Sequence, residues 1–405
     1  MKKRQLSFNV GQLNNKMSTP LQKEKSVLRV IRDLGEVSRS DLVKLTGLSA
    51  PTVTRITDTL ISQHLVSHKE YAESTGGRPA ELLCFESKNN YVIGIEIGGN
   101  YVRAALSDLD REFVFEIQKS FEVGSQLEEI IEIVGVIIQN LVARAQKQNK
   151  KLLGIGIAIC GIVDKNTEEV VYSPVLDWKN INLKNRLKKY TDLPISIGNV
   201  ANLIAQGELY YGLGKTFSNF VAINLEYGIG AGIVVDNNLI FGIDGFSGEI
   251  GHTIVQLKGA RVGREGLAGS LEAYASTYGI LDVVNEAIKS GEQTVLTSIS
   301  RPLMLKDVIS AAGQGDDLSV KVIDEAASYL GLTIDFIVKL LNPEAIVLSG
   351  GLSIDEKNFV SKVRNVVHDL GMNMTNRAVQ VLVTNQGDEA ALVGAFSLIL
   401  SREIE

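Results

Sequence analysis

The sequence predicts an α/β protein with two facing lobes and a small helical domain at its N-terminus. Buried strands, an amphipathic helix and a further buried strand follow one another from residue 91, and a similar succession begins near residue 220. Duplicated α/β units of this kind pack as two lobes with a cleft between them. Before residue 90 both the charge and the hydrophobic periodicity differ, which sets the N-terminal domain apart.

The expected boundaries follow from these patterns. We expect residues 1–88 to form the N-terminal domain with its connection. Residues 89–199, joined by the C-terminal helix 388–405, should form the first lobe, and residues 200–387 the second. A chain of 405 residues is long enough to give each unit its own core.

The composition is ordinary for a soluble globular protein, with 45% hydrophobic and 22% charged residues. No apolar run is long enough to span a bilayer, and the basic N-terminus lacks the apolar segment of a signal peptide. Cys84 and Cys160 lie far apart and have no metal-ligand spacing. We therefore expect a cytoplasmic protein with reduced thiols.

Charge is distributed unevenly along the chain. Residues 1–85 contain 13 Lys and Arg against 8 Asp and Glu, whereas the remainder contains 28 against 39, for a net charge of −6. A basic domain on an acidic body suggests that only the N-terminal end meets a polyanion.

Three short helices are predicted in the basic domain. Apolar residues at helical spacing mark the first over residues 23–34, and Ser38 can cap the second. Ser49 is placed to cap a third helix that has Pro51 in its first turn and buries Val53, Ile56 and Leu60. Helices separated by a short Gly-containing turn are typical of a helix-turn-helix.

A hairpin is expected beyond these helices. Residues 65–70 and 80–85 can pair around Gly77-Arg78-Pro79 and form a wing. The domain is therefore predicted to be a winged helix-turn-helix that binds double-stranded DNA, the alternative being a packing module without a ligand. The candidate DNA-binding residues are Arg39, Ser49, Thr52, Thr54, Arg55 and Arg78.

Glycine-rich turns follow predicted strands in both lobes, at residues 98–99, 228–232 and 350–351. Such turns can hold phosphates with backbone N–H groups, although each is weak evidence because glycine also closes ordinary hairpins. Their symmetrical placement suggests an ancestor that bound a nucleotide.

The segment Gly248-Glu249-Ile250-Gly251-His252 carries the clearest binding chemistry. Glu249 can accept hydrogen bonds from vicinal hydroxyls, and His252 can donate from one ring nitrogen and accept at the other. Two glycines ease the backbone for close approach to a small molecule. Alone, the pattern would favour a polar loop whose Glu and His satisfy the local backbone; the motifs around it raise the binding hypothesis.

With these motifs the body, from about residue 91 to the C-terminus, resembles the ROK family of sugar kinases and repressors. The resemblance rests on residues 248–252, Asn199-Val200-Ala201-Asn202 and Leu348-Ser349-Gly350-Gly351, while Gly77-Arg78-Pro79 resembles the wing of ROK repressors. It implies an actin-like, ribonuclease-H-like sugar-kinase body behind a winged helix-turn-helix. It also implies sugar ligands at Asn199, Glu249, His252 and Glu272.

Departures from the family pattern argue against catalysis. Val200 stands where the kinases carry the aspartate that deprotonates the sugar hydroxyl, and valine has no lone pair to act as a base. Glu96 and Asn100 alter the first phosphate turn. Gly263, Glu265 and Ser270 align with the family's three zinc-binding cysteines, so we expect neither metal nor cofactor, because His252 alone cannot hold structural zinc.

Three hypotheses remain. The favoured one is a sugar-responsive transcriptional regulator, most simply a repressor of carbohydrate-utilisation genes, that acts as a homodimer or homotetramer without a membrane partner. A DNA-tethered sugar kinase is the second, supported by ancestry and opposed by Val200. The third is a DNA-binding protein whose body only dimerises.

Overall fold

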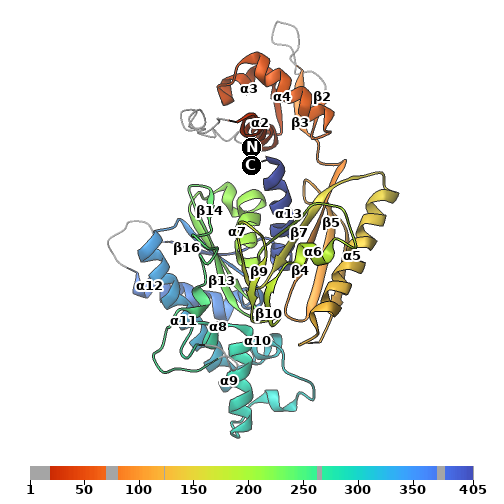
Figure 1. Cartoon of the computed structure of the whole chain (residues 1–405). Coiled ribbons are helices and arrows are strands. Elements are labelled where there is room, and N and C mark those ends of the chain that lie inside the picture. Colours follow the sequence, from red (N-terminus) through yellow and green to blue (C-terminus); the bar gives the residue numbers. More distant parts are fainter. Residues whose placement is uncertain (1–18, 70–80, 123, 262–266, 372–378, 405) are drawn as a thin grey trace.

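The computed structural model describes residues 19–69, 81–122, 124–261, 267–371 and 379–404, and in it a small helical head stands on a two-lobed body (Figure 1). The head contains α2 (Pro20–Leu34), β1 (Glu36–Ser38), α3 (Arg39–Thr46), α4 (Ala50–Ser62), β2 (Val66–Lys69) and β3 (Leu82–Phe85). Its strands form one sheet in the order β1-β3-β2.

The predicted head helices are confirmed, and their ends have local causes. Gly35 and Gly47 follow α2 and α3 with φ of 77° and 69°, and left-handed backbone of this kind ends a helix most easily at glycine. The Ser38 hydroxyl accepts from the Asp41 N–H, as expected of a cap. Ser49 differs from the prediction, because its hydroxyl pairs at 2.8 Å with that of Thr52 and makes no cap bond to the backbone of α4.

The two arms of the predicted wing are also confirmed. β2 and β3 pair antiparallel, with Val66 opposite Phe85. The tip between them, including Arg78, lies outside the described residues. β3 also pairs with β1, which ties the wing to the segment between α2 and α3.

The first lobe is a five-stranded sheet in the order β11-β7-β4-β5-β6. β4, β5 and β6 run antiparallel in sequence, and β7 and β11 add in parallel. Its elements are β4 (Asn90–Ile97), β5 (Tyr101–Asp108), β6 (Phe113–Ser120), α5 (Leu127–Lys147), β7 (Lys151–Ile159) and β11 (Ile195–Asn199). A small sheet, β10-β9-β8, and the short helix α6 lie between the last two strands: β8 (Ile162–Val163), β9 (Val170–Ser173), β10 (Trp178–Ile181) and α6 (Leu183–Leu187).

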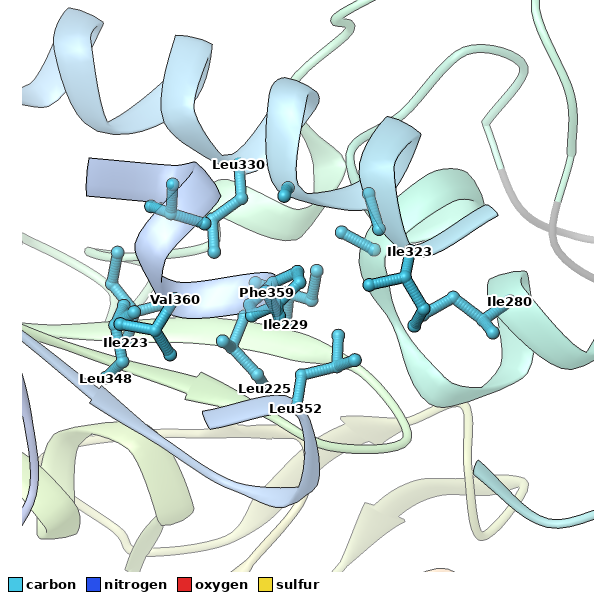
Figure 2. Packing of buried hydrophobic residues seen from close by; sticks show 14 of the residues in the cluster. Ile223, Leu225, Ile229, Ile280, Ile323, Leu330, Leu348, Leu352, Phe359 and Val360 are labelled. Atoms are coloured by element: carbon cyan, nitrogen blue, oxygen red, sulfur yellow. The ribbon is translucent and has the colours of Figure 1, made fainter. Parts of the chain in front are cut away.

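The second lobe repeats this topology, with strand order β14-β13-β12-β15-β16. Its strands are β12 (Phe220–Leu225), β13 (Ile229–Val235), β14 (Asn238–Ile240), β15 (Ala345–Ser349) and β16 (Gln380–Val383). Five helices accompany them: α8 (Glu272–Ala275), α9 (Thr277–Lys289), α10 (Leu305–Gly313), α11 (Asp317–Leu341) and α12 (Ser361–Leu370). Figure 2 shows Phe359, from the π-helical turn Glu356–Val360, at the centre of the core between these helices and the sheet.

Two further helices, α7 (Val200–Tyr211) and α13 (Ala390–Ile404), join the lobes. α7 packs on β12 and β13, α13 packs on β4 and β7, and the two helices pack against each other. Gly232, expected in a turn, lies inside β13. Glycine is needed at this position because a Cβ would come within 2.4 Å of the Ala205 Cβ on α7. The turn between β12 and β13 is correspondingly short and leaves only Glu226, Tyr227 and Gly228 outside the strands.

The head is docked on the body by a buried interface. Helix α13 rises from the body and ends beside α2 (Figure 1). Head residues such as Leu28 and Ile31 share one apolar cluster with Leu392 and Phe396 of α13. The connection between head and body is also pinned, since the Asn90 side chain donates to the His64 carbonyl oxygen at 2.7 Å. Within the described ranges, no helix is long and apolar enough to cross a membrane.

Candidate functional site

Glu249, His252 and Glu272 are brought together in the second lobe. His252 ends a short 3₁₀ helix (Ile250–His252), and Glu272 begins α8. The imidazole Nε2 lies 3.8 Å from a Glu249 oxygen, and Nδ1 lies 3.9 Å from a Glu272 oxygen. These distances exceed a hydrogen bond, so the three side chains do not satisfy one another. The carboxylates are 28% and 23% exposed and the imidazole 47%, which leaves polar atoms accessible to a ligand.

Strand β13 holds this group in place. The Glu272 Oε1 accepts from the Ile229 N–H at 2.8 Å, and the Ala231 N–H donates to the Gly248 carbonyl oxygen at 2.8 Å. Gly248 has a φ of 91°, and a Cβ there would lie 1.8 Å from the Ala231 oxygen, so this glycine is required by close approach to β13. Burial raises the pKa of Glu249, and the nearby His252 ring opposes that shift.

Asn199 lies at the junction of β11 and α7. Its Oδ1 accepts from the N–H groups of Ala201 and Asn202 at 2.9 and 3.2 Å, and its Nδ2 donates to the Gly161 carbonyl oxygen at 2.8 Å. The predicted ligand is therefore also the N-cap of α7. The first turn of α7 packs on β13 at Gly232, next to Ala231, whose N–H donates to the Gly248 carbonyl oxygen. β13 therefore contacts both the helix that follows Asn199 and the segment that carries Glu249 and His252.

Val200 is buried in the apolar cluster between the lobes and offers no polar atom at the position of the predicted lost base. Leu203 belongs to the same cluster, and Ala201 is also buried. Val200, identified from the sequence as the replacement of the catalytic base, therefore packs with apolar side chains in the structure.

A tyrosine side chain contacts each of two glycine turns, residues 98–99 of the first lobe and the turn before Ile229 of the second. Tyr101 donates to Glu96 at 2.8 Å, and its ring lies 2.5 Å from where a Cβ on Gly98 would stand. From the second lobe, the Tyr227 hydroxyl donates to the Asn100 Oδ1 at 3.1 Å. These turns therefore make side-chain contacts where the sequence had suggested a phosphate cradle, and neither tyrosine was singled out from the sequence.

Two half-buried carboxylates, Glu96 and Glu226, lie in the same region. Glu226 accepts from the Gly351 N–H at 2.8 Å, and burial, followed by the negative charge of Glu96, raises its pKa to about 7. Burial likewise raises the pKa of Glu96. At higher pH, when these groups are ionised, their charge would repel a nucleotide phosphate.

The predicted DNA-binding residues divide into two groups. Thr54 and Arg55 are exposed on α4, while Thr52 is half-buried and pairs with Ser49. Arg39 instead bonds to Thr57 and forms ion pairs of 2.8 Å with Asp58 and with Glu81. It joins α4 to the start of β3, which is a structural role that sequence periodicity does not reveal.

The segment aligned with the family's zinc loop is only partly described. Gly263 and Glu265 lie outside the described residues, and Ser270 is buried. In the part of the chain that the structure describes, no group of three or more His, Cys, Asp or Glu residues is arranged to hold a metal ion. The Tyr274 and Tyr329 hydroxyls both donate to Gln256, at 2.7 and 2.6 Å, and so tie one end of the segment to α8 and α11.

Comparison with known proteins gives consistent likenesses. The model of the ROK family matches residues 92–402. A xylose repressor of Caldicellulosiruptor bescii is 30% identical over 93% of this chain and 94% of its own length.

Two solved structures extend these likenesses to the fold. One, a ROK family transcriptional regulator homologous to the Escherichia coli MLC protein, has a TM-score of 0.82, 25% identity and coverage of 95% of this chain and 97% of its own. The other, a ROK family glucokinase from Streptomyces griseus in complex with glucose and AMPPNP, has a TM-score of 0.68 and 25% identity. It covers 76% of this chain and 98% of its own. The predicted two-lobed actin-like body is thereby confirmed.

Proposed function

The chain belongs to the ROK family, and from this premise we propose that it is a sugar-responsive transcriptional repressor whose kinase-like body senses a sugar without phosphorylating it. The observation that carries the proposal is the presence, in one chain, of an exposed α4 and the accessible Glu249, His252 and Glu272 group. The xylose repressor and the solved transcriptional regulator match nearly the whole chain, head included.

The direct test is operator affinity measured with and without each of a panel of unmodified sugars. We expect one or more monosaccharides to change that affinity roughly 5–150-fold, the usual range of allosteric coupling. Sugars that bind in calorimetry without changing operator affinity would favour a body that only dimerises. The proposed assembly is a homodimer on a two-fold-related operator, with half-sites a whole number of helical turns apart.

Arg55→Ala is expected to relax base preference. Arg55 is exposed on α4, the helix proposed to enter the major groove, and an arginine there can donate to two acceptors of one guanine. One such bidentate contact contributes about 1–3 kcal/mol of discrimination against the wrong base. Arg55→Lys is the matched control, because it keeps the charge but loses the planar fork. Both variants should lose preference for the operator over mutated sites, while only Arg55→Ala should also weaken the salt dependence of binding. Wild-type preference in both would assign base reading to other residues.

No sugar kinase activity is expected. Val200 removes the base, which typically contributes ~10²–10⁴-fold, and the Tyr101 and Tyr227 hydroxyls bond to Glu96 and Asn100, the two residues that alter the first phosphate turn. Phosphoryl transfer from ATP should therefore stay at background for any sugar that the same preparation binds. Turnover at about 1–100 s⁻¹ would instead support the tethered-kinase alternative. Val200→Asp should restore little, because both tyrosines remain.

A further inference from the structure

Helix α7 has one end at the candidate sugar site and the other at the DNA-binding head. At its start, the Asn199 side chain caps the helix. At its end, the guanidinium of Arg32, on α2 of the head, lies 4.6 Å from the centre of the Tyr210 ring. The helix has 12 residues and so spans about 18 Å.

Dense packing prevents α7 from absorbing a displacement locally. Ten of its residues are buried, from Val200 to Tyr210. On one side α7 packs on β13, where a Cβ on Gly232 would come within 2.5 Å of the Ala201 carbonyl oxygen. On the other side it packs on α13, where a Cβ on Gly394 would come within 2.4 Å of the Leu203 backbone. Close-packed interiors transmit strain, so movement of the cap should move the whole helix.

The far end of α7 is equally well anchored. The buried Glu208 accepts from the Leu213 N–H at 2.8 Å and from the Thr384 hydroxyl, which secures the turn that follows the helix. The Tyr211 hydroxyl donates to the Leu109 carbonyl oxygen at 3.1 Å, and Leu109 belongs to the apolar cluster shared by head and body. Beside it, the Tyr210 ring lies under the Arg32 guanidinium of α2.

We infer that α7 is the element that conveys sugar occupancy to the head, with the Arg32–Tyr210 contact as its output. The inference rests on the proposed function and names the route of its regulation. Both lone pairs of the Asn199 amide oxygen already cap α7, so a sugar hydroxyl that accepts from the amide nitrogen pulls on the cap itself. The resulting shift of α7 changes the position of Tyr210 under Arg32 and reorients α2 with the helices packed on it.

The test compares charge-neutralising variants on one face of the head. Arg32→Gln removes the cation above Tyr210, and Arg29→Gln, the matched control, removes a charge from the same helix that also pairs with Asp33. The quantity is the ratio of operator dissociation constants with and without the sugar that is active on wild type. Cation–π contacts are worth a factor of about 2–30, so Arg32→Gln should shrink the ratio by that factor and Arg29→Gln should preserve it.

A second pair of variants tests the other side of the contact. Tyr210→Phe keeps the ring and should keep the ratio, whereas Tyr210→Leu should reduce it as Arg32→Gln does. The double variant Arg32→Gln/Tyr210→Leu should show no further reduction. Sugar affinity without DNA should stay at the wild-type value in Arg32→Gln, which a general loss of folding would not allow.

The outcomes distinguish failure of the α7 relay from failure of the proposed repressor function. If wild type responds and Arg32→Gln responds equally, the relay is wrong while the proposed repressor function stands. If Arg29→Gln loses the response as much as Arg32→Gln, the general charge of α2 is responsible and the specific contact is refuted. If no bound sugar changes operator affinity in wild type, the proposed function fails, and the relay fails with it.

Discussion

Replacing Glu249 with alanine is expected to abolish the sugar response while leaving sugar-free operator binding unchanged. The carboxylate is 28% exposed and lies beyond hydrogen-bond distance of His252, so its oxygens are available for two sugar hydroxyls. Hydrogen bonds to a charged group contribute about 1.5–3 kcal/mol each. Loss of both should weaken sugar binding by roughly 10²–10⁴-fold, measured by calorimetry on the purified protein.

Two control variants test whether the loss of sugar binding is specific to the Glu249 carboxylate. Glu249→Gln keeps the shape and one acceptor, so its sugar affinity should fall between those of wild type and Glu249→Ala. Glu286→Ala removes an exposed carboxylate from α9 of the same lobe, which pairs only with its neighbour Lys289 among the contacts described, and should bind sugar as wild type does. Unaltered sugar affinity in Glu249→Ala would place the sugar elsewhere on the body.

Phe359→Ala is expected to be the most damaging single substitution for stability. The ring is fully buried in the core of the second lobe, among side chains from the sheet and from α11 (Figure 2). Truncating a buried phenylalanine typically lowers the free energy of unfolding by about 3–5 kcal/mol, because apolar contacts are lost and a cavity remains. The same core includes Leu271 and Ala275, on either side of Glu272, so sugar affinity should fall as well.

Phe336→Ala is the matched control for this prediction. Phe336 lies on α11 in the same lobe, but 59% of it is exposed, so its truncation should change stability by no more than about 0.5 kcal/mol. Denaturant unfolding of the two variants gives the comparison directly. Equal losses would mean that Phe336 is covered in solution, for example by a second copy of the chain.

Much of the fold was predictable because its signals are local. The amphipathic helix expected between the first buried strands from its apolar spacing is α5, Leu127–Lys147. The strands of both lobes were expected from short apolar runs, and the wing arms from turn residues between them. Ser49 was expected to cap α4 and its side chain makes no such bond, yet the helix still begins at the next residue, Ala50.

The candidate site was predicted less completely. Glu249 and His252 share one short motif, and the structure places them close together, with Glu272 beside them. Asn199 was expected as a ligand and also caps α7 through local bonds, whereas the bond from its amide nitrogen to Gly161 spans 38 positions of sequence. Arg39 was expected at DNA, and its ion pairs with Asp58 and Glu81 depend on how α3, α4 and the wing pack.

The sequence by itself determined the duplicated α/β pattern, the helix-turn-helix and the absence of a base at Val200, because periodicity, capping and side-chain chemistry are properties of short segments. Only the tertiary structure decided what occupies the glycine turns and how the head meets the body. Tyr227 reaches Asn100 across 127 positions of sequence, and Arg32 reaches Tyr210 from another domain. Such contacts follow from the packing of whole lobes, so no local pattern of residues encodes them.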